Sequence, residues 1–120
     1  MQAPRLAAVS WCALALTAPF ATPAHALAPQ VATAVFGGQF APSEIKVVQG
    51  GTLTFVNLDP QLQHDLISKD NPDLFRSDIV SFGGVSEVRG VSSLPVSTWP
   101  FTCSVHDYMA GNLEIVAAPA

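Results

Sequence analysis

The sequence predicts an all-β domain, a Greek-key antiparallel β-sandwich of seven to eight strands. Short segments rich in Val, Ile, Thr and Phe recur along the chain, and Gly and Pro turns separate them. No segment of the sequence has a long apolar stripe of helical period, and none is repeated. One core built from many short strands is therefore expected.

The strands are predicted from runs of β-forming residues between turn signals. In chain order they cover residues 31–36, 44–48, 52–57, 64–68, 79–82, 86–91, 96–103 and 112–117. Gly50 and Gly51 separate the second strand from the third and indicate a hairpin. Residues 71–78 are expected to contain a helical turn at most.

The strand at 96–103 has two faces that its alternation distinguishes. Trp99, Phe101 and Cys103 lie on one side, and we assign this side to the core. Pro100 has no N–H to donate to a sheet ladder, so this strand should lie near an edge or have its proline at a non-bonded position. The Cys103 thiol is then expected at the end of a buried strand.

The N-terminal residues have the pattern of a secretory signal peptide. Residues 6–16 form an apolar run that is too short for a convincing membrane span, and small residues follow it. We predict a signal peptide at residues 1–26 with cleavage after Ala26, or alternatively after Ala28. Residues 27–120 are then long enough for one exported domain, in a periplasm or outside the cell.

The predicted mature chain contains only one possible set of soft and imidazole ligands. Its single Cys is Cys103, its single Met is Met109, and its two His are His64 and His106. Thiolate and thioether sulfur favour Cu(I) and imidazole suits Cu(II), and His2Cys with a weak axial Met is typical of blue-copper electron-transfer sites. The sequence therefore predicts one copper site, although zinc can occupy such a ligand set.

The charge balance limits the possible partners. Cleavage removes Arg5 and none of the nine acidic residues, so the formal net charge changes from −4 to −5. A chain without a basic patch is a poor candidate for nucleic-acid binding, whereas a basic protein would be attracted to it.

A lone thiol in an oxidising compartment is a liability unless it is buried or bound to metal, which favours Cys103 as a ligand.

Residues 39–117 resemble the cupredoxins, most closely the small plastocyanin and amicyanin type. The resemblance rests on Phe-Thr-Cys-Ser-Val-His-Asp-Tyr-Met-Ala-Gly at 101–111 and on Asn-Leu-Asp-Pro-Gln-Leu-Gln-His at 57–64. It implies one type 1 copper ion with His64, Cys103 and His106 as equatorial ligands and Met109 as the axial ligand. It also implies that electrons leave through His106, inside an apolar patch for which the candidates are Pro60, Leu62, Val105 and Tyr108.

Two positions depart from the pattern of these relatives. Asp65 stands where Asn is common, and its carboxylate is expected to accept a hydrogen bond from the Ser104 hydroxyl and to lower the reduction potential. Val105 stands where Pro is common, and its N–H is expected to donate to the Cys103 sulfur and to raise the potential. Because the two effects oppose each other, the sign of the net displacement stays open.

The resulting interpretation is a monomeric one-electron carrier that is not an enzyme. Its partner would be a cytochrome, a dehydrogenase or a reductase, bound transiently and without stable membrane insertion. Thr102 and Ser104 flank Cys103 where a multicopper oxidase needs His, which argues against an oxidase. Two alternatives stay open: a protein that carries or buffers copper without transferring electrons, and a metal-free β-sandwich that binds other proteins.

Overall fold

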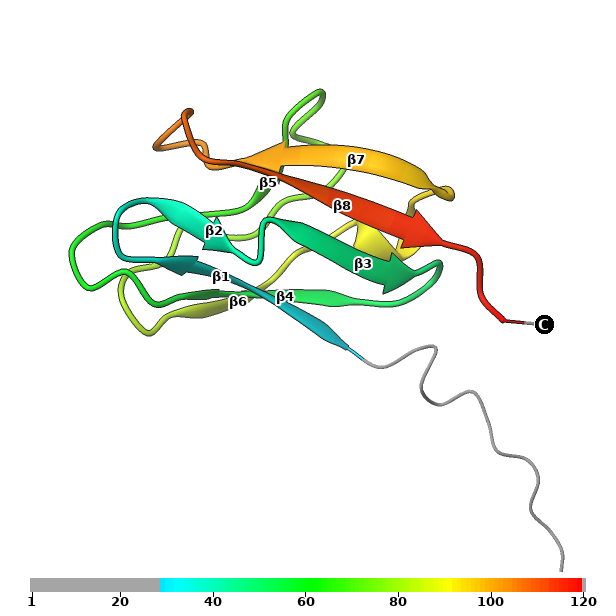
Figure 1. Ribbon diagram of the computed structural model, residues 1–120, viewed down its shortest axis with the longest axis horizontal. Coiled ribbons are helices and arrows are strands. Elements are labelled where there is room, and N and C mark those ends of the chain that lie inside the picture. Colours follow the sequence, from blue (N-terminus) through cyan, green and yellow to red (C-terminus); the bar gives the residue numbers. More distant parts are fainter. Residues whose placement is uncertain (1–28, 120) are drawn as a thin grey trace, which may run out of the picture.

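The computed structural model describes residues 29–119, and the predicted signal peptide at residues 1–26 lies outside this range. The described chain forms eight strands (Figure 1). They are β1 (Gln30–Val35), β2 (Gln39–Ala41), β3 (Glu44–Val48), β4 (Leu53–Asn57), β5 (Ile67–Ser68), β6 (Val85–Glu87), β7 (Ser97–Thr102) and β8 (Ala110–Val116). A single 3-10 turn, η3 (Val91–Ser93), precedes β7. Within this range there is no helix long and apolar enough to cross a membrane.

The strands form two packed sheets of four strands, which confirms the predicted β-sandwich. One sheet has the order β2-β1-β4-β6 and the other β3-β8-β7-β5. The pairing is mixed and not purely antiparallel, because β1 runs parallel to β4 and β3 runs parallel to β8. Between β1 and β4, and again between β3 and β8, the chain passes through the other sheet. The expected antiparallel pairing is wrong for these two pairs.

The predicted hairpin at Gly50-Gly51 is also wrong. The Gly51 N–H donates to the Val48 carbonyl at 2.7 Å, and Gly50 has a φ of +88° that favours glycine. The turn is tight, but β3 before it and β4 after it belong to different sheets. The two strands have better partners elsewhere, β8 for β3 and β1 for β4, so the glycines join the layers of the sandwich.

Two predicted strands are much shorter than expected, one does not form, and one strand was not expected. Of residues 64–68 only the last two form a strand, and residues 79–82 contribute one bridge, between Val80 and His64. The 64–68 segment is short because side chains take its backbone donors: the Leu66 N–H donates to Ser77 Oγ at 2.9 Å. The strand predicted at 86–91 ends at Glu87. The unexpected strand is β2, whose three residues were not predicted to form one.

The core lies between the two sheets and follows the alternation of the strands. Ile45 and Val47 of β3 are buried, as are Leu113 and Ile115 of β8. On β7, Phe101 is buried and Trp99 packs against the core, so the predicted core face of this strand is confirmed. The strand lies between β8 and the two-residue edge strand β5, so it is near the edge of its sheet but is not the edge itself. The loop from β7 to β8 then projects at the end of the sandwich opposite the C-terminus (Figure 1).

Candidate metal centre

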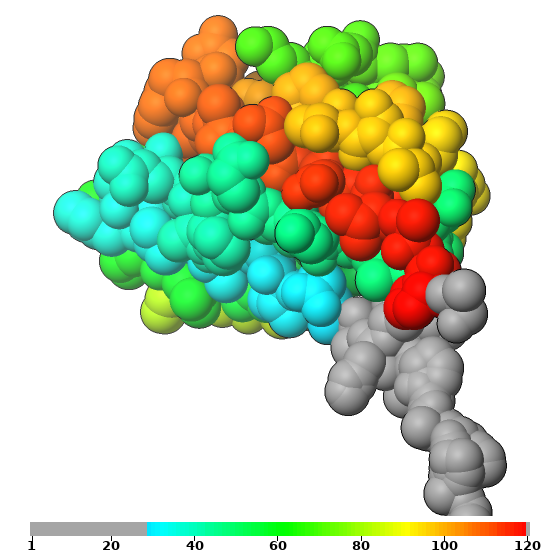
Figure 2. Space-filling model, turned by 45° about the vertical axis from the view of Figure 1, so that its right-hand side comes forward, coloured from blue at the N-terminus to red at the C-terminus, as the bar shows by residue number. Residues whose placement is uncertain are grey.

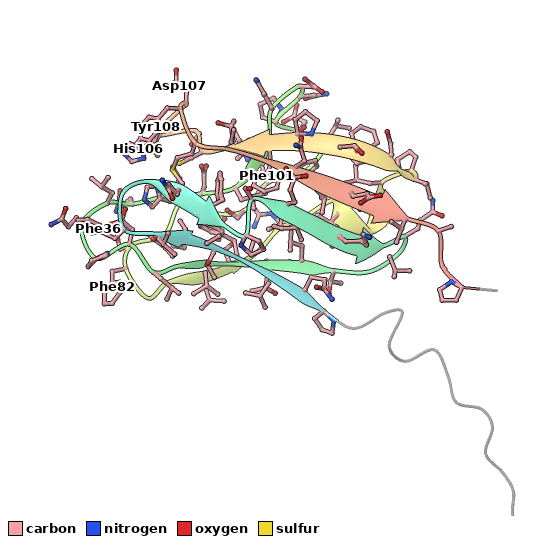
Figure 3. All side chains as sticks on the ribbon, in the orientation of Figure 1. Phe36, Phe82, Phe101, His106, Asp107 and Tyr108 are labelled. Atoms are coloured by element: carbon pink, nitrogen blue, oxygen red, sulfur yellow. The ribbon has the colours of Figure 1, made fainter. Side chains whose placement is uncertain are left out.

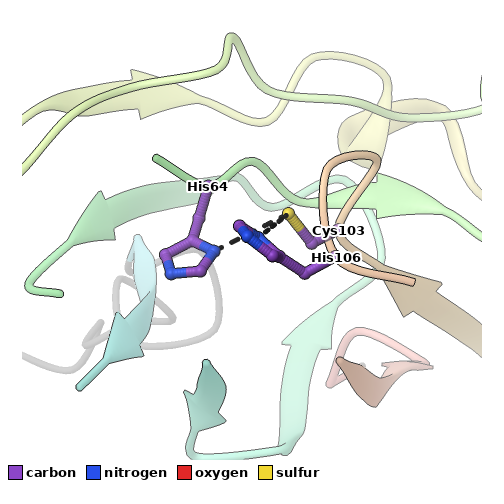
Figure 4. A group of neighbouring side chains, drawn as sticks. All are labelled: His64, Cys103 and His106. Carbon is purple, nitrogen blue, oxygen red and sulfur yellow. Dashed lines mark hydrogen bonds between the residues drawn. The ribbon is translucent and has the colours of Figure 1, made fainter. Parts of the chain in front are cut away.

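Three of the four predicted ligands converge at that end of the sandwich. The ligand atoms of His64, Cys103 and His106 all lie within 4.8 Å of one another (Figure 4). The Cys103 sulfur lies 3.8 Å from His64 Nδ1 and 3.9 Å from His106 Nδ1. In the part of the chain that the structure describes, this is the one group of His, Cys and acidic side chains arranged to hold a metal ion.

Separate parts of the fold bring these side chains together. Cys103 immediately follows β7, whose ladder with β8 extends to the pair Thr102 and Ala110. His64 belongs to the segment after β4, where its N–H and carbonyl both bond to Val80, at 3.1 and 2.9 Å. Both sheets therefore contribute to holding the site, since β4 and β7 belong to different sheets.

The loop that carries His106 is closed by its own hydrogen bonds. The Met109 N–H donates to the His106 carbonyl at 3.0 Å, and the Thr102 hydroxyl donates to the Met109 carbonyl at 2.7 Å. The Met109 side chain is buried at the end of this loop. Its burial is compatible with the predicted axial role, which stays a prediction.

The donor atoms fit a single copper ion. A metal bonded to sulfur at about 2.3 Å and to nitrogen at about 2.0 Å, with an angle near 120°, holds these atoms about 3.7 Å apart. The measured sulfur-to-nitrogen distances of 3.8 and 3.9 Å match this geometry. Cys103 is 1% exposed and His64 is fully buried, whereas His106 is half-buried and reaches the surface. The set combines one soft sulfur with two imidazoles, as copper prefers.

The surroundings of the Cys103 sulfur act on its pKa in two directions. Burial raises the pKa of the thiol, since the thiolate loses its hydration. Backbone N–H groups of Asp65, Val105 and His106 oppose this shift. The Asp65 N–H lies 3.4 Å from the sulfur. The Val105 N–H acts on the sulfur in the expected direction, since it lowers the pKa of the thiol, and its predicted hydrogen bond stays a prediction.

Asp65 joins the two segments that carry the candidate ligands. One carboxylate oxygen accepts the Ser104 N–H at 2.7 Å and the other accepts the Ser104 hydroxyl, also at 2.7 Å. The predicted hydrogen bond to Ser104 is thus confirmed, and the carboxylate is buried. The Asp65 side chain therefore holds the His64 segment against the Cys103 loop, as well as placing a negative charge beside the site.

Asp59 is a residue that sequence analysis did not single out. Its Oδ2 lies 2.8 Å from His64 Nε2, on the side of the ring opposite Cys103, and both side chains are buried. The hydrogen bond with His64 is the main cause that lowers the pKa of Asp59. An acid in a polar loop usually indicates a solvated surface, so only its position five residues before the expected ligand hinted at this contact.

The two segments that carry His64 and the half-buried His106 also carry exposed apolar side chains. The four predicted patch residues are all exposed: Pro60, Leu62, Val105 and Tyr108. Phe36 and Phe82 are exposed at the same end of the molecule, although sequence analysis missed both (Figure 3). The Tyr108 ring packs edge-on against His106, with 5.8 Å between the ring centroids. A side chain at Gly38, in the turn between β1 and β2, would overlap Tyr108. Figure 2 shows the ligand loop, in orange, close to the cyan part of the chain.

No protein-family model and no curated protein matches this sequence, but many solved structures match the fold. A purple cupredoxin from Nitrosopumilus maritimus has a TM-score of 0.61 at 21% identity, over 71% of this chain and 97% of its own. Auracyanin A, a blue copper protein from Chloroflexus aurantiacus, has a TM-score of 0.58 at 17% identity, over 73% and 99%.

A copper-containing nitrite reductase from Thermus scotoductus SA-01 also matches, with a TM-score of 0.60 at 24% identity over 73% of this chain. The match covers 22% of that reductase, so this chain corresponds to a small part of it. Similarity at such identities concerns the fold, and the same fold is found in all three proteins. The chain has the cupredoxin fold.

Proposed function

We propose that this chain is an exported one-electron carrier with one type 1 copper ion held by His64, Cys103, His106 and Met109. The convergence of one sulfur and two imidazole nitrogens within 4.8 Å, at one end of a cupredoxin sandwich, carries the proposal. Copper would supply the Cu(II)/Cu(I) couple. Residues 27–120 would form the exported domain after removal of residues 1–26, in a periplasm or outside the cell.

The protein residues would keep the ligand geometry constant and exclude water. Cys103 and His64 are held by β7 and by the bridge to Val80, and both are buried. A rigid site changes little between oxidation states, so little reorganisation opposes electron transfer. His106 would connect the site to a partner, because it is the half-buried member of the group.

The surface around His106 suits a brief encounter with another protein. Val105 and Tyr108 of its own loop are exposed there, and Phe36 and Phe82 are exposed at the same end of the molecule. Apolar contacts of this kind form a small interface that releases its partner quickly. The excess of acidic residues favours a basic partner such as a cytochrome, a dehydrogenase or a reductase, with the carrier itself a monomer.

Two other functions fit the same fold less well. A copper carrier that hands over its metal usually presents exposed Met and His, whereas Met109 and His64 are buried. A nitrite reductase is less well supported, because the match covers 22% of that reductase and the described residues contain one candidate metal group. An electron carrier accounts both for the burial of His64 and Cys103 and for the partial exposure of His106.

Copper titration of the purified mature protein tests the proposal. After Cu(II) is added, we expect an intense blue absorption band and a narrow copper hyperfine splitting in the paramagnetic resonance spectrum. Ascorbate should bleach the band, and reoxidation should restore it. A pale, tetragonal Cu(II) spectrum would instead favour the copper carrier, and the absence of binding would leave the protein-interaction module.

We expect Asp65→Asn to raise the reduction potential of the copper protein. The substitution removes a buried negative charge that stabilises Cu(II), whereas asparagine can still accept the Ser104 N–H. Unit charges at 4 Å interact by about 4 kcal/mol at an effective dielectric constant near 20, and less at longer range, so tens of millivolts are expected. Voltammetry measures the shift, and an unchanged or lower potential would contradict this role of Asp65. Asp70→Asn, at an exposed acid, is the control.

A further inference from the structure

The His64 ring is held between two buried groups that contact its two nitrogens. Nδ1 faces the Cys103 sulfur at 3.8 Å, and Nε2 faces a carboxylate oxygen of Asp59 at 2.8 Å. His64 is fully buried and Asp59 is 1% exposed, so water does not compete freely for either nitrogen. The protonation of each nitrogen is therefore decided by these two neighbours.

The chemistry of a carboxylate determines which nitrogen carries the proton. An ionised carboxylate only accepts hydrogen bonds, and a neutral imidazole has one donor and one acceptor nitrogen. Asp59 therefore selects the form of His64 with the proton on Nε2. The lone pair of Nδ1 then points toward Cys103, where a metal ligand is required.

The loop is built so that the Asp59 carboxylate faces the ring. Asn57, at the end of β4, accepts the Asp59 N–H through Oδ1 at 2.8 Å. Its Nδ2 donates to the carbonyls of Leu62 and Val80, at 2.9 and 2.8 Å. The Gln61 N–H donates to Asp59 Oδ1 at 2.9 Å, which leaves Oδ2 for His64. The orientation of Asp59 is thus set by the backbone and does not depend on His64 alone.

We propose that Asp59 is a positioning residue that fixes the tautomer and the orientation of His64, so that the copper site is prepared before the metal binds. The inference rests on the proposed function, because it assigns His64 as a metal ligand. Losing the carboxylate partner of a metal-binding histidine typically costs about 10- to 100-fold in metal affinity.

The first experiment needs no metal. Nitrogen-15 NMR of the reduced, metal-free protein distinguishes a protonated from an unprotonated imidazole nitrogen in His64. We expect the proton on Nε2 in the wild-type protein. Asp59→Asn has one amide oxygen, for which the Gln61 N–H and His64 compete, so it should keep the Nε2 proton less completely. Asp59→Ala should show a mixture of both tautomers. A wild-type protein with the proton on Nδ1 would overturn the proposal, whether or not the variants fold.

The second experiment measures Cu(II) affinity by competition with a chelator. We expect Asp59→Ala to weaken binding by about 10- to 100-fold and Asp59→Asn to recover part of this loss. Asp70→Ala, which removes an exposed acid, is the control and should bind as the wild type does. Equal affinity in Asp59→Ala and the control, with the Nε2 tautomer retained, would show that Asp59 only supports the loop.

The two experiments separate a failure of this inference from a failure of the proposed function. If the wild-type protein binds no copper, the proposed function is wrong, and the NMR result still decides whether Asp59 sets the tautomer. If copper binds and the tautomer of Asp59→Ala is unchanged, the proposed function stands and the positioning role is rejected.

Discussion

We expect Cys103→Ser to abolish the blue absorption band of the copper-loaded protein. In a His2Cys site, Cys103 is the only thiolate, and the intense band of a blue-copper centre requires a bond between Cu(II) and thiolate. A serine oxygen is a hard donor that stays protonated near neutral pH, so it does not replace the sulfur. Any Cu(II) that still binds through His64 and His106 should give a pale spectrum. Visible absorption and paramagnetic resonance measure the change.

Loss of the blue band reports the loss of the thiolate ligand only if the Cys103→Ser protein still folds. Serine is close to cysteine in size. The backbone N–H groups near the buried sulfur can also donate hydrogen bonds to a serine oxygen. A buried polar group that is not fully satisfied costs about 1–3 kcal/mol, which circular dichroism and thermal unfolding will reveal. Ser97→Ala, exposed at the other end of β7, is the control and should keep the band. A blue Cys103→Ser protein would show that Cys103 is not the ligand.

The parts of the fold that depend on local sequence were predicted well. The strand at 44–48 has the predicted boundaries, and the core face of β7 follows from alternation alone. The spacing of Cys103 and His106 places both side chains on one short loop. Such features depend on a few neighbouring residues, so the sequence is sufficient to predict them.

Features that depend on distant partners could not be predicted in the same way. The Gly50-Gly51 turn has the same local geometry whether it makes a hairpin or joins two sheets, and the parallel partners of β3 and β4 decide between these outcomes. Asp59 is polar and belongs to a loop, which indicates exposure. It is buried because the loop folds under Asn57 and against the Val80 segment. Pairing and loop packing of this kind are tertiary properties.

The largest expected loss of stability comes from Phe101→Ala, which acts directly beneath the site. The Phe101 side chain is fully buried and meets Phe40 edge-on, with 4.8 Å between the ring centroids. Because Phe40 belongs to β2 and Phe101 to β7, this contact joins the two sheets. The Phe101 ring also covers Gly111 of β8, where a side chain would overlap it. Truncation of a buried phenylalanine costs about 3–5 kcal/mol, a large part of the about 5–15 kcal/mol that stabilises a typical domain.

Urea unfolding of the metal-free protein is the appropriate measurement, since bound copper would add stability by mass action. Phe82→Ala is a matched control, because Phe82 is 63% exposed and should change the free energy of unfolding by about 0.5 kcal/mol or less. Phe101 lies two residues before Cys103, and Gly111 directly follows the ligand loop. The contact between Phe101 and Gly111 therefore packs the two ends of this loop together. Phe101→Ala should therefore also weaken copper binding, whereas Phe82→Ala should leave it unchanged. Equal stability of the two variants would show that the sheets are not held together at Phe101.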